Sequence, residues 1–228
     1  YDAPICWFPK SVDNSGGGQA WVESDKWGPF KDDLLHLSYG TCSLYKVMYE
    51  KVNGIPHGGV VRLPVNFTTG IMRAKFNDGD GKLYVCGLRG WQTSAAQDGA
   101  FSRVRYTGVP LTIPTGLKVV KDGIEITFTN PVDKDEAGDV QAYAISQWNY
   151  KYSEAYGSSD YSLKKPGEQG QDTVKIKSAK VSADGKTVKL EIPSIFPVMQ
   201  MRIKIDILDT DENEVFYEIY NTINVVPN

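Results

Sequence analysis

The feature that most constrains the fold is a series of short segments rich in Val, Ile, Leu, Tyr and Phe, each bounded by Gly, Pro, Asn or Asp. Such segments occur at 34–40, 43–49, 60–65, 71–76, 82–88 and 100–106. The pair Asn53-Gly54 between two of them is typical of a tight hairpin. Helical periodicity is nearly absent. We therefore expect an all-β chain whose first part is an antiparallel meander without crossover helices.

A proline-containing stretch over 107–115 predicts a linker between two domains, 1–108 and 109–228. Beyond it, Asp122-Gly123 predicts another hairpin, and about seven strands follow, with a short helical turn capped by Asp133. That strand number is typical of an immunoglobulin-like β-sandwich, although the Cys–Trp–Cys signature is missing. A long exposed loop is expected over 152–170.

Charge and hydropathy exclude two classes of partner. The 228 residues include 25 Lys and Arg against 28 Asp and Glu, a formal charge of −3, which argues against a nucleic-acid partner. No run of 18 apolar residues is present, so no membrane span is expected. The chain starts at Tyr1, without Met or a signal peptide, and we expect it to be a piece of a longer protein.

Cysteines and histidines are few and scattered. Cys6, Cys42 and Cys86 lie in apolar surroundings, which predicts buried free thiols, or one disulfide with a leftover thiol in an exported protein. Neither His36 nor His57 lies in a recognisable catalytic or metal-binding motif.

No metal site is predicted. Asn77, Asp78 and Asp80 offer oxygen ligands for calcium, but the same residues favour a simple turn. The acidic segment that begins at Asp209 mimics a calcium-binding loop, yet Glu214 stands where an EF-hand requires glycine.

Several motifs carry a resemblance to a known family. The segment Asp80–Thr93, followed by Arg103-Val104-Arg105-Tyr106, resembles the last blade of β-propellers of the soluble glucose/sorbosone dehydrogenase type. Residues 13–21 resemble a loop of the preceding blade. A closed propeller needs about four to eight blades. The resemblance therefore implies that 1–108 supply terminal blades of an incomplete propeller, whose other blades belong to the same protein or to another chain.

The whole chain resembles the C-terminal end of large secreted dehydrogenase-like proteins of planctomycete-type bacteria. This resemblance implies a periplasmic or extracellular location. It also implies a quinone or c-type haem elsewhere in the assembly, with no cofactor held by this chain. The second half resembles bacterial immunoglobulin-like domains, which serve as spacers or packing modules. The residues that carry this second resemblance are 127–133, Ala137, Tyr143 and Trp148.

The best local candidate for a ligand site is the polar loop after 82–88. Here Arg89 would bind an anionic or carbonyl oxygen, Trp91 would stack on a ring, and Gln92 adds a polar group. Trp27, which precedes Gly28-Pro29, is also predicted to lie on a loop and to stack on a sugar or quinone ring.

Two further groups complete the candidates. Asp13 and Asn14 precede three glycines, 16–18, which allow a close approach of the backbone to a ligand. His36 alternates with leucines and faces away from them, either as a structural histidine or as a residue of a central channel. No catalytic residue is identified.

The first functional hypothesis is that this chain is the C-terminal portion of an exported sugar-dehydrogenase-like propeller protein. It would contribute one sector of the propeller and a packing domain to a redox assembly. If that assembly is an enzyme, it is a quinone- or haem-linked sugar or aldehyde oxidoreductase, and this chain alone is not catalytic. The alternative is a non-catalytic binding or scaffold module of a secreted or cell-surface complex, which contacts a small sugar, a glycan or a protein.

Overall fold

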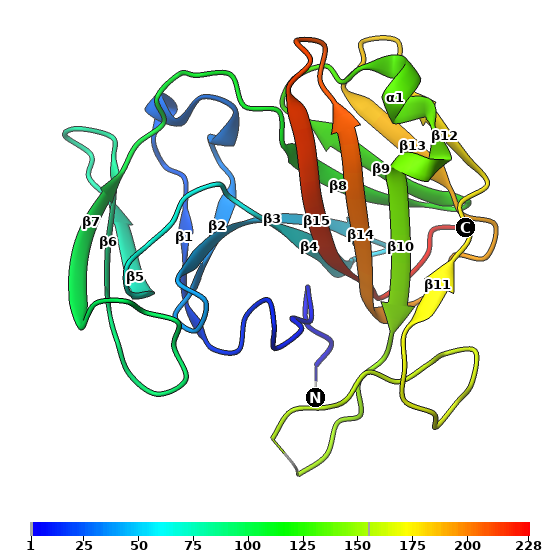
Figure 1. Ribbon diagram of the computed structural model, residues 1–228, viewed down its shortest axis with the longest axis horizontal. Coiled ribbons are helices and arrows are strands. Elements are labelled where there is room, and N and C mark those ends of the chain that lie inside the picture. The colour runs from blue at the N-terminus through cyan, green and yellow to red at the C-terminus, as the bar shows by residue number, and fades with distance from the viewer. Residues whose placement is uncertain (1, 155) are drawn as a thin grey trace. The chain divides into compact units, whose positions relative to one another are not determined.

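The computed structural model describes residues 2–154 and 156–228, with 46% of the chain in strands and 6% in helices (Figure 1). The sheets are antiparallel, and none that the described residues form closes on itself. The expected all-β fold class is therefore confirmed. None of the described helices has the length and hydrophobicity needed to cross a membrane.

The chain forms two compact units. The N-terminal unit consists of residues 8–47 and 61–110, and the C-terminal unit of residues 1–7, 48–60 and 111–228. The division after residue 110 falls inside the stretch expected as a linker, but 1–7 and 48–60 group with the second half of the chain. The end of that stretch is part of the C-terminal unit, because Thr112 is buried and its hydroxyl donates to Asp209 Oδ2 at 2.8 Å.

The N-terminal unit contains two antiparallel sheets. The first consists of β1 (Gly16–Trp21), β2 (Leu34–Ser38) and the first half of β3 (Ser43–Val52). The second has the order β5 (Gly70–Phe76), β6 (Leu83–Leu88) and β7 (Gly99–Val104). A 3-10 helix, η1 (Asp25–Phe30), connects β1 with β2. β1 and β2 pack against β5, so the core lies between the two sheets.

The three glycines expected in a loop lie instead in strand β1. A Cβ atom added at Gly17 would be 2.1 Å from the carbonyl oxygen of Ile71. Glycine therefore permits β1 to cross the backbone of β5 at close range, as small residues do where two backbones approach. The close approach that the sequence indicated exists, and its partner is a strand.

The C-terminal unit contains strands of two antiparallel sheets. One has the order β12 (Ser178–Val181), β13 (Thr187–Glu191), β9 (Gly123–Phe128) and β8 (Pro114–Val120). The other has the order β4 (Ile55–Arg62), β15 (Glu214–Ile223), β14 (Val198–Leu208), β10 (Tyr143–Trp148) and β11 (Asp172–Val174), with the second half of β3 beside β4. Two short helices, α1 (Lys134–Gly138) and η2 (Val140–Ala142), precede β10.

Period-two burial explains the strands of this unit. In β14, Ile203, Ile205 and Ile207 are buried, and in β9 Ile124 and Ile126 are buried. Their neighbours in sequence are more exposed, as expected when one face of each sheet covers a shared core.

Most local signals agree with the structure. Asn53 and Gly54 have φ of 52° and 81°, the positive angles that a tight hairpin requires. Asp133 is the N-cap of α1 and accepts from the backbone of Asp135 and Glu136. Residues 173–179 are divided between the end of β11 and the beginning of β12 and do not form one continuous strand.

A half-buried carboxylate connects the β3–β4 hairpin to β8 within the C-terminal unit. Glu50 Oε1 accepts from the backbone N–H of Val119 at 2.6 Å and lies 3.0 Å from Nε2 of the fully buried His57. The other ring nitrogen of His57 accepts from the backbone of Asn224 at 3.2 Å. Both histidine nitrogens are thus used in holding this unit together.

Candidate functional site

The N-terminal unit contains a buried polar cluster centred on Asp13 and His36. His36 Nε2 lies 2.6 Å from Asp13 Oδ2, and Asp13 is 9% exposed. The other oxygen, Oδ1, accepts from Ser38 Oγ at 2.6 Å and from the backbone of Ser15 at 3.0 Å. A buried carboxylate is stabilised when each of its oxygens accepts hydrogen bonds, and Asp13 meets that condition.

The second nitrogen of His36 fixes its hydrogen-bonding pattern. Nδ1 lies 3.2 Å from the side-chain amide nitrogen of Gln19, so Nδ1 accepts and Nε2 donates to Asp13. Phe8 stacks on the imidazole, with ring centroids 4.7 Å apart and an interplanar angle of 28°. The alternation with Leu35 and Leu37 thus places His36 on the opposite side of β2, against Phe8 and Asp13.

The cluster does not have the arrangement of a Ser–His–Asp relay. In such a relay the serine bonds the histidine, which is then held by the carboxylate. Here Ser38 and His36 both bond Asp13, and the described residues form no hydrogen bond between Ser38 and His36. The arrangement instead fixes β2 to the segment that precedes β1.

Two more of the predicted residues lie beside this cluster. Asn14 Nδ2 donates to the backbone oxygen of Gln92 at 2.9 Å, which connects the turn after residue 9 to the loop between β6 and β7. Gln92 has a φ of 52°. Asn14 also occupies the space next to Gly40, where an added Cβ would meet the Asn14 amide oxygen at 1.5 Å. The fold therefore brings Asp13, Asn14, His36 and Gln92 to one region of the N-terminal unit.

Trp27 lies elsewhere, in the core of the same unit. It is 4% exposed, its indole N–H donates to the Gly81 carbonyl at 3.1 Å, and its ring packs edge-on against Phe76. The expectation that Trp27 sits on an open loop is therefore corrected: η1 turns the ring inward, where it fills the space between the sheets.

Arg89 and Trp91 lie on the surface. The loop that carries them is closed by a hydrogen bond from the backbone of Arg89 to Asp98 at 2.9 Å. The Trp91 side chain is 68% exposed. Ligand contact by these two residues, or by the cluster around Asp13, stays a prediction.

A surface that the sequence analysis missed lies on the solvent-facing side of β5, β6 and β7. We call it the outer sheet face. It consists of Lys75 and Arg73 on β5, Tyr84, Cys86 and Leu88 on β6, and Phe101 and Arg103 on β7. Because these positions pair across the three strands, their side chains share one side of the sheet, opposite to that of Phe76, Leu83 and Val85.

Aromatic side chains lie at the centre of the outer sheet face. Tyr84 and Phe101 stack with ring centroids 5.6 Å apart and an interplanar angle of 27°. The Tyr84 hydroxyl donates to Asp80 Oδ2 at 2.8 Å, while Phe101 remains 72% exposed. Hydrogen bonds from the Lys82 backbone and from Tyr84 lower the pKa of Asp80. An exposed aromatic cluster of this kind is typical of an interaction surface.

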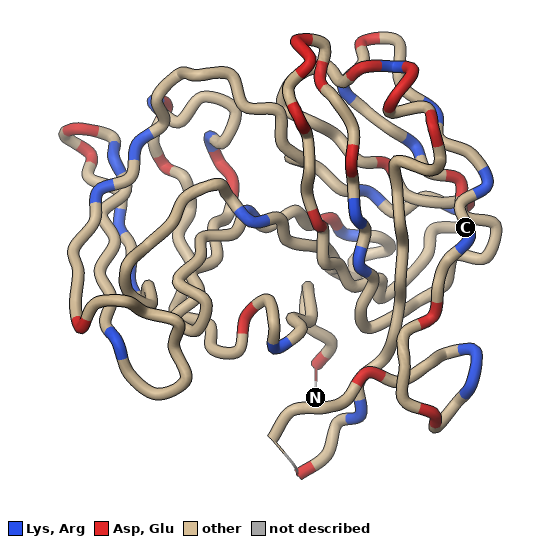
Figure 2. The backbone as a smooth tube through the Cα atoms, viewed as in Figure 1, with Lys and Arg blue, Asp and Glu red and all other residues tan. Residues whose placement is uncertain are grey.

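Cations surround these rings. The segment 70–106 contains six Lys and Arg residues and three Asp residues, a formal charge of +3 within a chain of −3. Figure 2 shows Lys and Arg positions along β5 and β7 and at the two ends of β6, with the acidic positions confined to the turns. The strand alternation could have revealed this surface, because in β7 exposed and half-exposed residues alternate and no position is buried.

The same alternation corrects the cysteine prediction. All three cysteines are free thiols; Cys42 is buried and Cys6 half-buried, but Cys86 is exposed. Val85 points into the core and Cys86 therefore points to the outer sheet face.

One ion pair is buried in the N-terminal unit. Lys46 Nζ lies 2.8 Å from Asp33 Oδ1, and the lysine side chain is 2% exposed. Burial lowers the pKa of Lys46 and raises the pKa of Asp33. The ion pair between them acts in the opposite direction but is the weaker effect. Asp33 Oδ2 has no hydrogen-bond partner among the described residues, so the pair costs stability that the surrounding core must offset.

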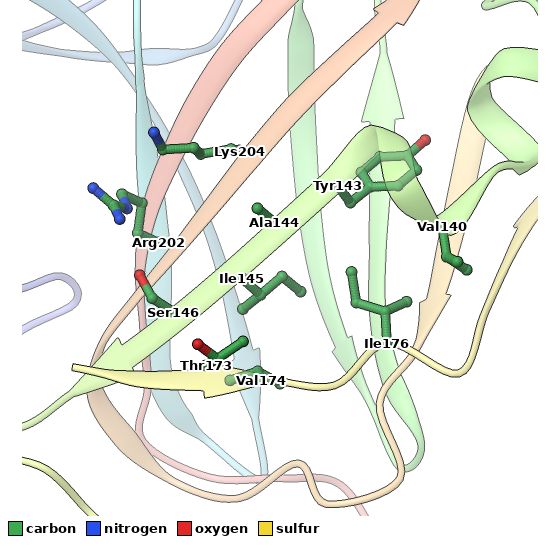
Figure 3. Close-up of a pocket in the computed structure, with 10 residues that line it drawn as sticks. All are labelled: Val140, Tyr143, Ala144, Ile145, Ser146, Thr173, Val174, Ile176, Arg202 and Lys204. Atoms are coloured by element: carbon green, nitrogen blue, oxygen red, sulfur yellow. The ribbon is translucent and has the colours of Figure 1, made fainter.

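The C-terminal unit has a hollow of about 450 Å³ beside β10 and β11. In Figure 3, the apolar side chains of Ile145, Val174 and Ile176 lie on one side of β10, whereas Arg202 and Lys204 point to the other. Lys204 also forms an ion pair with Glu218 at 3.3 Å. The apolar side chains and the two cations that line this hollow therefore lie on different sides of β10.

The turn at 77–81 uses its oxygen atoms internally. Asn77 Oδ1 accepts from Gly79 N at 2.8 Å, and Asp80 Oδ1 accepts from Lys82 N at 3.0 Å. The described residues contain no group of three or more His, Cys, Asp or Glu side chains placed to hold a metal ion.

Comparison of the chain with protein-family models, with curated proteins and with solved structures finds no match.

Proposed function

We propose that this chain is a non-catalytic interaction module of a larger exported assembly, in which the N-terminal unit docks another β-element through strand β7. The observation that carries this proposal is that β7 is an edge. It pairs with β6, and no other described strand pairs with it. An unpaired edge presents a row of backbone donors and acceptors that another strand can bind.

The finer fold assignments belong to the same proposal. The sheet β5–β6–β7 is a blade-like meander that lacks a fourth strand, and the C-terminal unit is an immunoglobulin-like sandwich that serves as a packing domain. Support for the blade comes from its three antiparallel strands with one covered face. Support for the sandwich comes from its two antiparallel sheets around an apolar core.

The non-catalytic part of the proposal is supported by the cluster around Asp13. Its carboxylate, imidazole and hydroxyl groups are buried and bond one another, so they stabilise the unit. The assembly itself is proposed to be sugar-dehydrogenase-like, with quinone or c-type haem held outside this chain. Dye reduction with sugars by the intact native protein tests that part, and an assembly without quinone or haem absorption would contradict it.

Hydrogen exchange tests the docking role directly. The alternate amides of 99–104 that point away from β6 should exchange rapidly in the isolated chain and slowly in the intact native protein, because a docked strand protects them. The central strand β9 serves as the control and should be protected in both samples. Equal exchange of 99–104 in the two samples would overturn the proposal.

A second candidate function is glycan contact by the loop that carries Trp91. The observation that favours it is the 68% exposure of this indole beside the exposed Arg89, since a free aromatic face suits a sugar ring. Glycan-array binding by the chain that is lost in Trp91→Ala would support it. Binding that is unchanged by this substitution would remove Trp91 from the site.

A further inference from the structure

We propose that the strand recognised by β7 is acidic, with carboxylates at alternate positions that face the outer sheet face. This inference rests on the proposed function of β7 as a docking edge and adds the chemistry of its partner. Two independent observations carry it: the unpaired edge and the uncompensated positive charge beside it.

The positive charge at this edge has no hydrogen-bond or ion-pair partner among the residues that the structure describes. Arg103 lies on the outer sheet face of β7 and Arg105 follows directly after the strand, and both are exposed. Neither side chain forms a hydrogen bond or ion pair with another described residue. By contrast, Nζ of Lys82, which directly precedes β6, lies 3.6 Å from Asp80 Oδ2. Arg103 and Arg105 are therefore cations at the edge that a carboxylate could neutralise.

The row of side chains along β7 defines what an added strand must supply. Phe101 and Arg103 point to the outer sheet face, and Ala100, Ser102 and Val104 point to the inner side, where they are half-buried. Opposite-charge and aromatic pairs between adjacent strands are stabilising. The complementary strand thus carries small apolar residues on its inner side. On its outer side it carries carboxylates near Arg103 and Arg105 and an aromatic residue near Phe101.

A second copy of the chain is a poor occupant. Two antiparallel β7 strands in the register that places Arg103 of one copy opposite Arg105 of the other would juxtapose like charges, which destabilise a ladder. The arginines therefore protect the edge from self-association and at the same time select an acidic partner. A polyanion without a strand, such as a sulfated glycan or a nucleic acid, would use the charge and leave the edge amides free.

Synthetic peptides test this inference on the whole chain. The probe is a fluorescein-labelled Glu-Val-Glu-Val-Tyr-Val-Thr peptide, designed to run antiparallel to β7, as every ladder of the N-terminal unit does. Its matched control has Gln in place of both Glu residues. Anisotropy should give affinity about tenfold higher for the Glu peptide, from two favourable cross-strand charge pairs. Hydrogen exchange should show protection at 99–104.

Charge variants locate the contact. Arg103→Glu should lower the affinity for the Glu peptide about tenfold. The same variant should bind a peptide with Lys in place of Glu more tightly than it binds the Glu peptide. Lys75→Glu makes the same change on β5, two strands and about 10 Å from β7. Because salt at physiological ionic strength screens charges at this distance, Lys75→Glu should lower the affinity for the Glu peptide less than about threefold. If Lys75→Glu weakens binding as much as Arg103→Glu does, the anion lies across the face and the inference is wrong.

The outcomes separate this inference from the docking role. If the Gln peptide protects 99–104 as well as the Glu peptide does, strand addition stands and the acidic partner is rejected. If dextran sulfate displaces the Glu peptide and no amide of 99–104 is protected, the site binds polyanions and both proposals fail. If no peptide binds below millimolar concentration, the acidic partner is rejected, and exchange in the native assembly decides the docking role separately.

Discussion

His36 Nε2 donates to Asp13 Oδ2 across 2.6 Å, and the same carboxylate accepts from Ser38 and from the backbone of Ser15 through its other oxygen. One buried carboxylate thus satisfies three donors that come from different parts of the N-terminal unit. Its removal takes the acceptor from the buried His36 Nε2–H and from the half-buried Ser15 N–H, which is the more costly way to lose a hydrogen bond, whereas Ser38 Oγ still has Thr41 Oγ1 at 2.9 Å.

We therefore expect Asp13→Ala to lower the free energy of unfolding of the N-terminal unit by about 3 kcal/mol. Denaturant unfolding, followed by hydrogen exchange in β2, measures this loss. Asp98→Ala is the control, because Asp98 is exposed and should cost less than about 0.5 kcal/mol. Equal effects of the two substitutions would show that the Asp13 cluster contributes little.

The sequence predicted much of the fold and little of this cluster. Alternating apolar residues and turn pairs such as Asn53-Gly54 located most strands, because these signals are local. Asp13 and His36 are 23 positions apart and form no motif, so their contact follows only from the pairing of β1 with β2. Likewise, nothing local indicates that 48–60 belongs with the second half, since this depends on β4 pairing with β15.

Where the sequence predicted the wrong surroundings for a residue, the difference also has a physical reason. Trp27 precedes Gly28-Pro29, which indicates a loop, but a short 3-10 helix at this point turns the indole into the core. Glycines at 16–18 also favour a loop, yet they serve a strand that crosses β5 too closely for side chains. In both places a tertiary contact outweighs the local preference.

The three cysteines should differ sharply in reactivity. Burial raises the pKa of the Cys6 thiol to about 12, so at pH 8 only about one molecule in ten thousand carries the reactive thiolate there. Cys42 is buried, whereas Cys86 is exposed on the outer sheet face. Treatment of the native chain with a maleimide at pH 7.5 should therefore modify Cys86 first.

Mass spectrometry of the modified chain checks this order. Cys86→Ser should remove the fast reaction, and Cys42→Ser should leave it unchanged. Rapid modification at Cys6 or Cys42 in the folded chain would mean that the surroundings of these thiols are open to solvent.

Acid should weaken the C-terminal unit through Asp209. Burial tends to raise the pKa of this carboxyl, but hydrogen bonds from Asn213, Thr112 and the Asp211 backbone outweigh it, and the pKa lies below its usual 3.8. A carboxyl whose pKa is lower in the folded state stabilises the protein above pH 3.8, and this stability is lost as the pH falls through the folded-state value.

We therefore expect Asp209→Asn to lower the unfolding free energy by about 2 kcal/mol at pH 7 and by much less at pH 2. Urea unfolding monitored by circular dichroism at both pH values measures the difference. The neighbouring Asp211→Asn, at an exposed position, is the matched control and should change stability little at either pH. A loss in Asp209→Asn that does not depend on pH would contradict the role assigned to its charge.

The crossing of β1 over β5 makes Gly17 hard to replace. An alanine Cβ at this position would lie 2.1 Å from the Ile71 carbonyl oxygen and 2.8 Å from the Met72 Cα, and backbone atoms cannot move aside as a side-chain end can. Gly17→Ala should therefore separate the two sheets and cost more than about 2 kcal/mol. Gly138→Ala, where nothing lies within 4 Å of the added methyl, is the control and should be neutral or slightly stabilising. Thermal unfolding of both variants measures these effects on stability. A Gly17→Ala protein as stable as the unsubstituted chain would mean that β1 lies farther from β5 than the structure shows.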